Sequence, residues 1–196
     1  VSNAFLAAVG SPLAKAHAAP HLERFHLARL RGILAKEACD ITVGMDAAER
    51  KEFHAALEHF VLGTDMGIHG EVVAAVAAPL DVLRAAVHLA DLSGSCSSAR
   101  VATRWGARVL EEFRMLGDRA KAAGLDPRAV GGLNRDEPAL PSASAASHAA
   151  FVRDVVRPVL VSLAARIAGL SDHVERLDSV VSFWTAETDA ARRHRL

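Results

Sequence analysis

The stretch Val87-His88-Leu89-Ala90-Asp91-Leu92-Ser93 places an aspartate at the end of an apolar helical run. Leu83, Val87 and Asp91 are spaced by four residues, so a helix puts them on one face. Burying a carboxylate without a partner is costly, and a metal ion, a basic side chain or a polar pocket must compensate. The stretch therefore predicts a chemical site at Asp91 in addition to a packed helix.

The same exception to the helical pattern recurs along the chain. Two more acids and one histidine occupy positions at which the helix period calls for an apolar residue. We therefore expect the chemistry of the protein to lie where the apolar pattern is interrupted. The stripes in question are Leu57, Val61 and Asp65; Trp105, Val109 and Glu112; and His148, Phe151 and Val155.

Each of these polar residues also has a purely structural interpretation. Asp65 and Asp91 fit residues that cap a following turn or pair with arginines. Glu112 fits an acid at the exposed edge of its helix. His148 fits a hydrogen-bonded core histidine or a residue in the first turn of a helix. The spacing alone leaves these interpretations open.

The composition favours one aliphatic domain. The chain has 196 residues, which suits a single domain over residues 1–196 or part of a larger one. Hydrophobic residues make up 51% and aromatic residues only 5%, so we expect a core of Ala, Val and Leu. The net charge of +0 does not indicate a nucleic-acid groove or a polybasic membrane anchor. No apolar run approaches the roughly 20 residues that a membrane helix needs.

Cys39 and Cys96 stand alone, without a Cys-x-x-Cys spacing. Isolated cysteines are typical of reduced thiols, so we expect a cytoplasmic protein. Tethering to a membrane through regions outside the chain stays open. The chain begins with Val1 and not with methionine, and we expect that an N-terminal part was removed or never included.

Start and stop signals predict helices almost throughout. Asp46 and Glu49 have the capping-box spacing, Gly124 follows a long helical pattern, and Pro158 predicts a kink inside another. Residues of about 124–147 are rich in Gly, Pro, Ser and Asp and predict a long loop, of the kind used as lids or binding loops. The chain is therefore expected to be all-α, with helices at about 21–36, 47–61, 79–90, 98–123, 147–169 and 171–193.

Several segments form an ordered series of motifs. They are Asn3-Ala4-Phe5-Leu6, Leu22-Glu23-Arg24-Phe25-His26, Thr64-Asp65-Met66 with His69, His88 to Ser93, Trp105 with Glu111-Glu112-Phe113, and Gly117-Asp118. In this order they resemble the motifs of the class I 3′,5′-cyclic nucleotide phosphodiesterases. The chain resembles the catalytic domain of that family over essentially its whole length.

The resemblance implies a compact all-α multi-helix bundle of the HD-type phosphodiesterase domain, truncated at its N-terminus. It implies hydrolysis of cAMP, cGMP or both to the 5′-nucleotide, in signal transduction. Members of the family use two divalent ions, zinc and magnesium or manganese, which hold a bridging hydroxide, and a histidine protonates the leaving oxygen. The implied partner is a cyclic nucleotide and not a nucleic acid, and a homodimer stays open.

The resemblance also assigns roles by position. Asp91 matches a zinc-ligating aspartate, and Glu112 matches the carboxylate that orients the general-acid histidine. His148 takes the place of the glutamine that hydrogen-bonds the purine. The remaining matches are the residues around the metal centre, Glu23, His26, Thr64 and Asp65, and the two apolar jaws that hold the base, Val109 and Phe151.

The chain departs from the family pattern at several points. The His-Asn-x-x-His and His-Asp motifs, which carry the general acid and most metal ligands, do not occur in it. Asp91 alone cannot hold a catalytic zinc ion, which normally has three protein ligands, so we expect the fragment to be inactive by itself. Gly94 replaces the usual asparagine and His148 the usual glutamine, so the sequence does not decide between cAMP and cGMP.

Three functional hypotheses follow. The first is a metal-dependent cyclic-nucleotide phosphodiesterase of which this chain is the C-terminal part. The second is a degenerate homologue that binds a nucleotide or a partner without turnover, which Gly94 and His148 favour. The third is a helical interaction domain without a ligand, which does not explain why acids recur on apolar faces in the order of the family.

Overall fold

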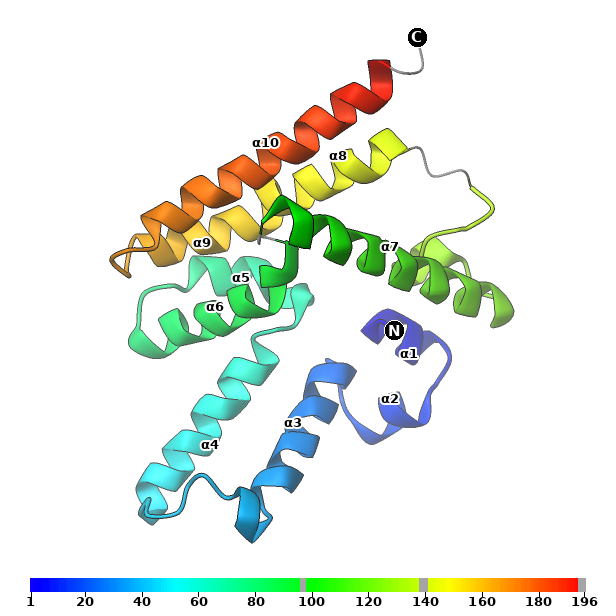
Figure 1. Cartoon of the computed structure of the whole chain (residues 1–196). Coiled ribbons are helices and arrows are strands. Elements are labelled where there is room, and N and C mark those ends of the chain that lie inside the picture. Colours follow the sequence, from blue (N-terminus) through cyan, green and yellow to red (C-terminus); the bar gives the residue numbers. More distant parts are fainter. Residues whose placement is uncertain (96–97, 138–140, 194–196) are drawn as a thin grey trace.

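The computed structural model describes residues 1–95, 98–137 and 141–193, and within these ranges the chain is built from helices without a strand. The expected all-α class is confirmed. In Figure 1, α7 crosses the middle of the molecule, between the layer of α8, α9 and α10 and the helices α1 to α4. Within the described ranges, no helix has both the length and the apolar character needed to cross a bilayer.

Four helices make up the N-terminal part: α1 (Asn3–Ala8), α2 (Pro12–Ala16), α3 (His21–Leu34) and α4 (Ala47–Leu62), with the 3-10 turn η1 (Glu37–Cys39) before α4. The capping box predicted for α4 is confirmed. The Asp46 carboxylate accepts from the backbone N–H groups of Ala48 and Glu49, and the Glu49 side chain accepts from the backbone N–H of Asp46. Cys39 is a half-buried free thiol, and Cys96 lies outside the described residues.

The middle of the chain carries the two longest predicted motifs. Its elements are η2 (Met66–Ile68), α5 (His69–Ala74), α6 (Pro79–Leu92), η3 (Ser93–Ser95) and α7 (Ala99–Ala122). Pro79 stands in the first turn of α6, so the predicted start of this helix at about residue 79 is confirmed. Gly124 follows α7 with φ +71°, a left-handed conformation that glycine adopts without strain, so the predicted end of this helix is confirmed.

The loop predicted at about 124–147 is wrong in its second half. It contains the 3-10 turn η4 (Pro127–Val130), and α8 begins at Pro141 rather than near Ser147. The first residues of α8 are small and polar, a composition that favours a loop. Alanine is nevertheless the strongest helix former, and proline suits the first helical position, so the segment forms a helix.

The C-terminal part forms a layer of its own. Its elements are α8 (Pro141–Phe151), the π-helical turn η5 (Val152–Val156), α9 (Arg157–Ala164) and α10 (Ser171–Arg193), and α10 packs along α8 and α9 (Figure 1). Pro158 has no N–H, and its ring crowds the carbonyl four residues earlier. The helical ladder accordingly widens into the π turn directly before α9.

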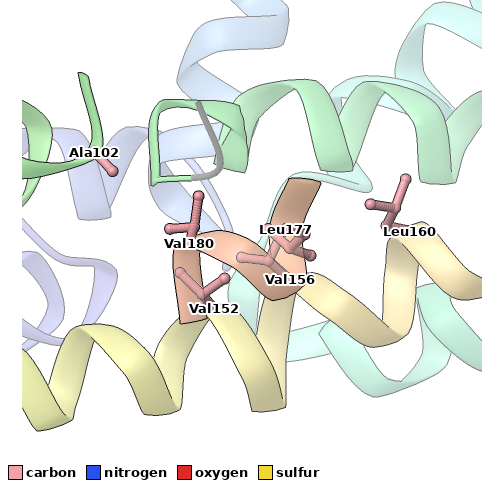
Figure 2. Close-up of a cluster of buried hydrophobic side chains, with 6 residues drawn as sticks. All are labelled: Ala102, Val152, Val156, Leu160, Leu177 and Val180. Carbon is pink, nitrogen blue, oxygen red and sulfur yellow. The ribbon is translucent and has the colours of Figure 1, made fainter. Parts of the chain in front are cut away.

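The buried core lies where α6, α9 and α10 meet. In one cluster, Val152 and Val156 of the π turn meet Leu177 and Val180 of α10 (Figure 2). A second cluster joins α5, α6 and α9, and Leu89 of α6 packs against both. Full burial of a Val or Leu side chain contributes roughly 1.5–3 kcal/mol, so these clusters fix α6 against α9 and α10.

Two leucines test this core with the same chemical change. Leu163 is 1% exposed and belongs to the second cluster, whereas Leu83 of α6 is 52% exposed. We expect Leu163→Ala to lower the free energy of unfolding by about 2–5 kcal/mol, and Leu83→Ala to lower it by less than about 1 kcal/mol. Urea unfolding followed by circular dichroism measures both values. Equal losses in the two variants would contradict this assignment of the core.

Candidate functional site around Asp91, Glu112 and His148

Asp91 lies in the last turn of α6 and is exposed. The prediction that it is buried is wrong, because the stripe that it continues faces outward: Leu83 is 52% exposed and Val87 39%. The buried face of α6 carries Ala85 and His88 instead. Among the described residues, no basic side chain forms an ion pair with Asp91. Its carboxylate is therefore exposed to solvent, and its role as a metal ligand stays a prediction.

Glu112 lies on the outer side of α7, with 66% of its side chain exposed. Its carboxylate is 3.3 Å from the ammonium group of Val1. The interpretation as an acid at the exposed edge of its helix is confirmed, and the buried position suggested by the helical period is wrong. The buried face of α7 is formed by Ala102, Leu116 and Ala120.

Asp65 and Thr64 stabilise the connection between α4 and α5. The half-buried Asp65 carboxylate accepts a hydrogen bond of 2.9 Å from the backbone N–H of Gly67, so it caps η2 and its interpretation as a capping residue is confirmed. The Thr64 hydroxyl donates to the carbonyl of Val61 at 2.9 Å. Their position around a metal centre stays a prediction.

Glu23 and His26 lie on α3, next to the N-terminal helix. The Glu23 carboxylate accepts from the side-chain NH2 group of Asn3 at 2.8 Å, and the side-chain Oδ1 of Asn3 accepts from the backbone N–H of Leu22 at 2.9 Å. These bonds tie the start of α1 to α3. His26 is exposed, with its ring 6.1 Å from that of Phe25. Neither residue contacts Asp91 by a hydrogen bond or an ion pair within the described ranges.

Two histidines of the motif segments form a buried pair. His88 is 1% exposed, and its Nε2 atom is 2.9 Å from Nδ1 of His69 at the start of α5. One of these nitrogens must donate and the other accept, so the two rings cannot both be fully protonated in this contact. Nδ1 of His88 is buried without a hydrogen bond of good geometry among the described residues, although the Gly63 backbone favours the protonated form of the ring. Burial lowers the pKa of His88 below its ordinary value, His69 acts in the same direction, and Asp91 opposes the shift.

The imidazole of His148 is held between α7 and α10. It stacks on Trp184 with ring centroids 4.8 Å apart and an interplanar angle of 25°. Its Nε2 atom lies 2.2 Å from the place that a Cβ atom would take at Gly106, so only a glycine leaves room for this ring. The half-buried His148 thus packs against two helices besides its own, and its contact with a purine stays a prediction.

At Gly94, as at Gly106, an aromatic ring occupies the space that a side chain would take. A Cβ atom at Gly94 would lie 2.9 Å from the indole of Trp105. Trp105 and Gly106 are consecutive residues of α7. Gly94 and His148, the two substitutions predicted to bear on the purine, therefore both pack against one turn of α7.

The two residues predicted to hold the base, Val109 and Phe151, lie on different helices, α7 and α8. Phe151 ends α8, is half-buried and packs against the first core cluster, while Val109 is half-buried on α7. His148 contacts α7 at Gly106, which precedes Val109 by three residues. Within the described part of the chain, no hydrogen bond or ion pair joins Asp91 to Glu112. The roles of Val109 and Phe151 stay predictions.

The described residues do not by themselves fit a divalent metal ion. Residues 1–95, 98–137 and 141–193 contain no group of three His, Cys, Asp or Glu side chains that could hold one. A catalytic metal normally needs three protein ligands, and Asp91 offers one carboxylate. A cavity of about 910 Å³ between α6, α9 and α10 is lined mainly by apolar residues such as Leu160 and Leu163, and the predicted site residues do not line it.

Comparison with known proteins identifies the family. The family model described as 3′5′-cyclic nucleotide phosphodiesterase matches residues 1–177. The chain belongs to this phosphodiesterase family. The resemblance predicted from the motifs is therefore confirmed.

Individual relatives agree with the family match. The chain is 30% identical over 147 residues to 3′,5′-cyclic-AMP phosphodiesterase 4C of Mus musculus, covering 64% of this chain and 21% of that protein. It is 27% identical over 125 residues to the probable 3′,5′-cyclic-AMP phosphodiesterase pde-4 of Caenorhabditis elegans, covering 54% of this chain and 18% of that protein. The chain thus spans only a minor part of the length of these curated relatives.

Solved structures show the same phosphodiesterase fold. A crystal structure of the phosphodiesterase domain of the RhoPDE fusion protein from the choanoflagellate Salpingoeca rosetta superimposes with a TM-score of 0.87 at 22% identity, over 98% of this chain and 65% of that chain. A second structure of the phosphodiesterase domain of the rhodopsin phosphodiesterase from S. rosetta gives 0.88 at 22% identity, over 100% and 63%. At this identity the similarity establishes the fold alone.

The structure also reveals residues to which the sequence assigned no role. His69 and His88 stand in the quoted motifs, yet their spacing did not show that they contact each other. Trp184 gave no signal beyond being an aromatic residue in a helical pattern. Arg135 lies in the segment interpreted as a loop, where nothing in the sequence indicates a partner on α7.

The pH dependence of stability tests the buried state of His88. An unfolded chain protonates this histidine near its ordinary pKa of 6.5, whereas burial holds the pKa lower in the folded chain. As pH falls below 6.5, the unfolded state binds the extra proton first, so the free energy of unfolding falls by up to about 1.4 kcal/mol per pH unit. Urea unfolding between pH 7.5 and pH 5.5 measures this loss.

His88→Gln should lose less stability than the unaltered chain over that pH range, because it removes the group responsible. His26→Gln is the matched control, since His26 is exposed, and it should keep the full loss. The same pH dependence in all three proteins would show that His88 is not the titrating group.

Proposed function

We propose that this chain is part of an enzyme that hydrolyses 3′,5′-cyclic nucleotides to 5′-nucleotides. The family match over residues 1–177 carries the proposal, because it includes the motif residues of α3, α6 and α7. The similar proteins of mouse and C. elegans are named 3′,5′-cyclic-AMP phosphodiesterases. The exposure of Asp91 and Glu112 supports it, since both carboxylates are accessible to groups from outside the described residues.

We infer that Asp91 contributes one ligand to a divalent-metal centre, with zinc and magnesium or manganese as its ions. Support comes from its position in the His88-to-Ser93 motif and from the lack of an ion-pair partner among the described residues. The other ligands would come from the His-Asn-x-x-His and His-Asp motifs of the family, which this chain does not contain. Around this centre, Glu23, His26, Thr64 and Asp65 are proposed to fix the ligand geometry.

The remaining residues are proposed to act on the substrate and on the general acid. Glu112 accepts a hydrogen bond from the general-acid histidine, fixes its orientation and raises its basicity. Val109 and Phe151 hold the base between apolar surfaces. Both are half-buried, so each can present one side to a base while the other packs against the protein.

The base end of the site is proposed to accept both cAMP and cGMP. Reading a purine edge requires a donor and an acceptor at fixed positions. Gly94 offers no side chain, and the ring of Trp105 occupies the adjacent space. His148 is stacked on Trp184 with one nitrogen against Gly106. The site therefore offers aromatic surface in place of the amide groups of the family pattern.

Substitution of Asp91 tests the enzyme proposal. In a protein that contains this chain together with both histidine motifs, Asp91→Ala should lower kcat/KM for cAMP by at least about a thousandfold and lower the bound zinc, because it removes a metal ligand. Asp81→Ala is the control on the same helix, where Asp81 pairs with His59 at 3.1 Å, and it should stay within about threefold. Release of 5′-AMP and metal analysis measure the effects.

Residues 1–196 alone should give no turnover and should retain no stoichiometric zinc. Normal turnover by the Asp91→Ala variant would refute the ligand role. Failure of the unaltered protein with zinc, magnesium and manganese would refute the enzyme proposal itself.

The nucleotide preference tests the proposed base site. We expect kcat/KM for cAMP and cGMP to differ by less than about tenfold, because Gly94 and His148 stand where the family pattern has side-chain amides. His148→Ala should raise KM for both nucleotides by a similar factor. A preference above about a hundredfold for either nucleotide, or a change in KM for one nucleotide only, would contradict this base site.

A homologue that binds nucleotide without turnover is the second candidate, favoured by Gly94 and His148. Binding of cAMP without release of 5′-AMP in the metal-loaded protein would support it over catalysis. A cytoplasmic location is also part of the proposal, supported by the free thiol of Cys39.

A further inference from the structure

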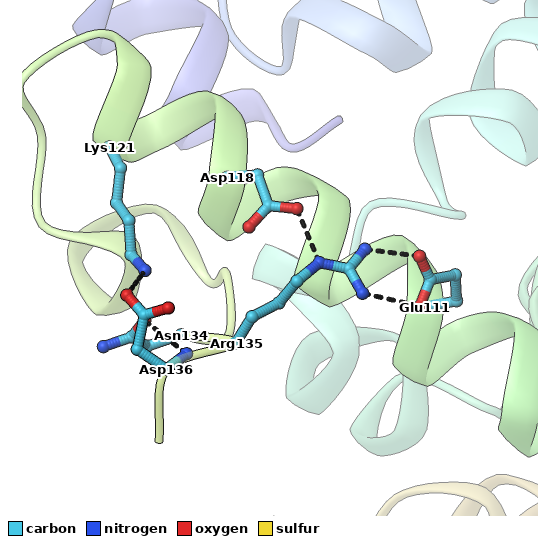
Figure 3. A network of polar contacts seen from close by, with 6 residues as sticks. All are labelled: Glu111, Asp118, Lys121, Asn134, Arg135 and Asp136. Carbon is cyan, nitrogen blue, oxygen red and sulfur yellow. Dashed lines mark hydrogen bonds and ion pairs between the residues drawn. The ribbon is translucent and has the colours of Figure 1, made fainter. Parts of the chain in front are cut away.

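Arg135 joins the segment after α7 to α7 itself. Its guanidinium donates two hydrogen bonds to the Glu111 carboxylate, one of them at 3.1 Å, and its Nε donates to Asp118 at 2.6 Å (Figure 3). Glu111 and Asp118 are seven residues apart, which places them two turns apart on one face of the helix. The planar guanidinium of arginine can donate to both carboxylates at once, whereas the compact ammonium group of lysine lacks this forked geometry.

The backbone of the same segment docks directly on α7. The N–H of Leu133 donates to the carbonyl of Phe113 at 2.9 Å. A Cβ atom at Gly117 would lie 1.9 Å from the Leu133 carbonyl oxygen, so this approach exists only because residue 117 is glycine. Gly132 makes a similar close approach, because a Cβ atom there would lie 2.6 Å from the backbone nitrogen of Gly117.

A second ion pair follows the first. Lys121 of α7 donates to Asp136 at 2.5 Å, and the Asn134 side chain accepts from the backbone N–H of Asp136 at 3.1 Å (Figure 3). Arg128, in contrast, pairs at 2.8 Å with Glu137, so its partner lies in the same segment and not on α7. The segment thus offers one arginine that bridges to the helix and one that does not.

We propose that Arg135 is a positioning residue that sets where α8 begins relative to α7. It lies shortly before Pro141, the first residue of α8, and α8 carries His148 and Phe151. Arg135 therefore holds to α7, the helix of Val109 and Glu112, the segment that leads to the helix of His148 and Phe151. The link to substrate rests on the proposed function, whereas the link between Arg135 and α7 does not.

The charges of this contact are well matched and partly open to solvent. The bonds to Glu111 and Asp118 raise the pKa of Arg135, and the bond to Arg135 lowers the pKa of Glu111. The side chains of Arg135, Glu111 and Asp118 are 37%, 48% and 45% exposed. Salt screens such exposed charges, so the contact is expected to weaken as ionic strength rises.

Hydrogen exchange of the Leu133 amide tests the contact in this chain without any activity. Arg135→Ala should speed exchange of this amide by about tenfold, because the segment then leaves α7 more often. Arg128→Ala is the matched control and should leave the exchange rate unchanged. Gly117→Ala should speed the same exchange, because its Cβ atom would clash with the Leu133 carbonyl while the charges of Arg135, Glu111 and Asp118 stay unchanged. Unchanged exchange in Arg135→Ala overturns the proposal.

Kinetics of the protein that also carries the histidine motifs test the link to substrate. Arg135→Ala should raise KM for cAMP by about five- to tenfold and leave kcat within about twofold, since it disturbs binding and not the reacting groups. Arg135→Lys should give an intermediate KM, because it keeps the charge and loses the fork. Arg128→Ala should match the unaltered protein.

The outcomes separate this inference from the proposed function. Faster Leu133 exchange with unchanged KM overturns the positioning role. Equal KM values for the Arg135 and Arg128 variants also overturn it. Absence of turnover in the unaltered protein refutes the proposed function, and the exchange of Leu133 then decides the contact with α7 alone.

Discussion

Two glycines of α7 let neighbouring segments approach its backbone more closely than any other residue would. At Gly106 the space of a side chain is taken by the imidazole of His148, and at Gly117 by the carbonyl of Leu133. The first approach fixes α8 and the second fixes the segment that leads to α8. The arrangement of the predicted substrate residues therefore depends on missing Cβ atoms on one helix, and ion pairs such as that of Arg135 strengthen contacts that the glycines make possible.

Most of the fold could be predicted because its signals are local. The capping box at Asp46, Pro79 in the first turn of α6 and Gly124 after α7 each act within a few residues, and all three were confirmed. The start of α8 differs from the prediction because the serines and prolines of the segment suggest a loop, whereas its alanines favour a helix. The contacts of Arg135 could not be predicted, since its partners depend on how a whole segment folds back on α7.

The motifs of the sequence predict which residues belong to the candidate site, but the helical period does not predict which of them are buried. Periodicity shows which residues share a face, but it does not show which face is covered. On α6 the stripe of Leu83 and Val87 is exposed, and the face of Ala85 and His88 is buried. Asp91 therefore lies on the outer side, although its stripe is apolar. At Asp65 the structure does not choose between two interpretations. Its hydrogen bond to Gly67 caps a turn, and this bond is compatible with the role that its motif predicts.

The adjacent acids Glu111 and Glu112 show how one helix can serve two neighbours. Consecutive side chains on a helix point about 100° apart, so the two carboxylates face different surroundings. Glu111 is held by Arg135 in the segment that leads to α8, and its charge is matched there. Glu112 is left on the other side, 66% exposed and beside the start of the chain. Arg135 engages only the first acid, and the second stays exposed on a different side of the helix, where its motif predicts the orienting role.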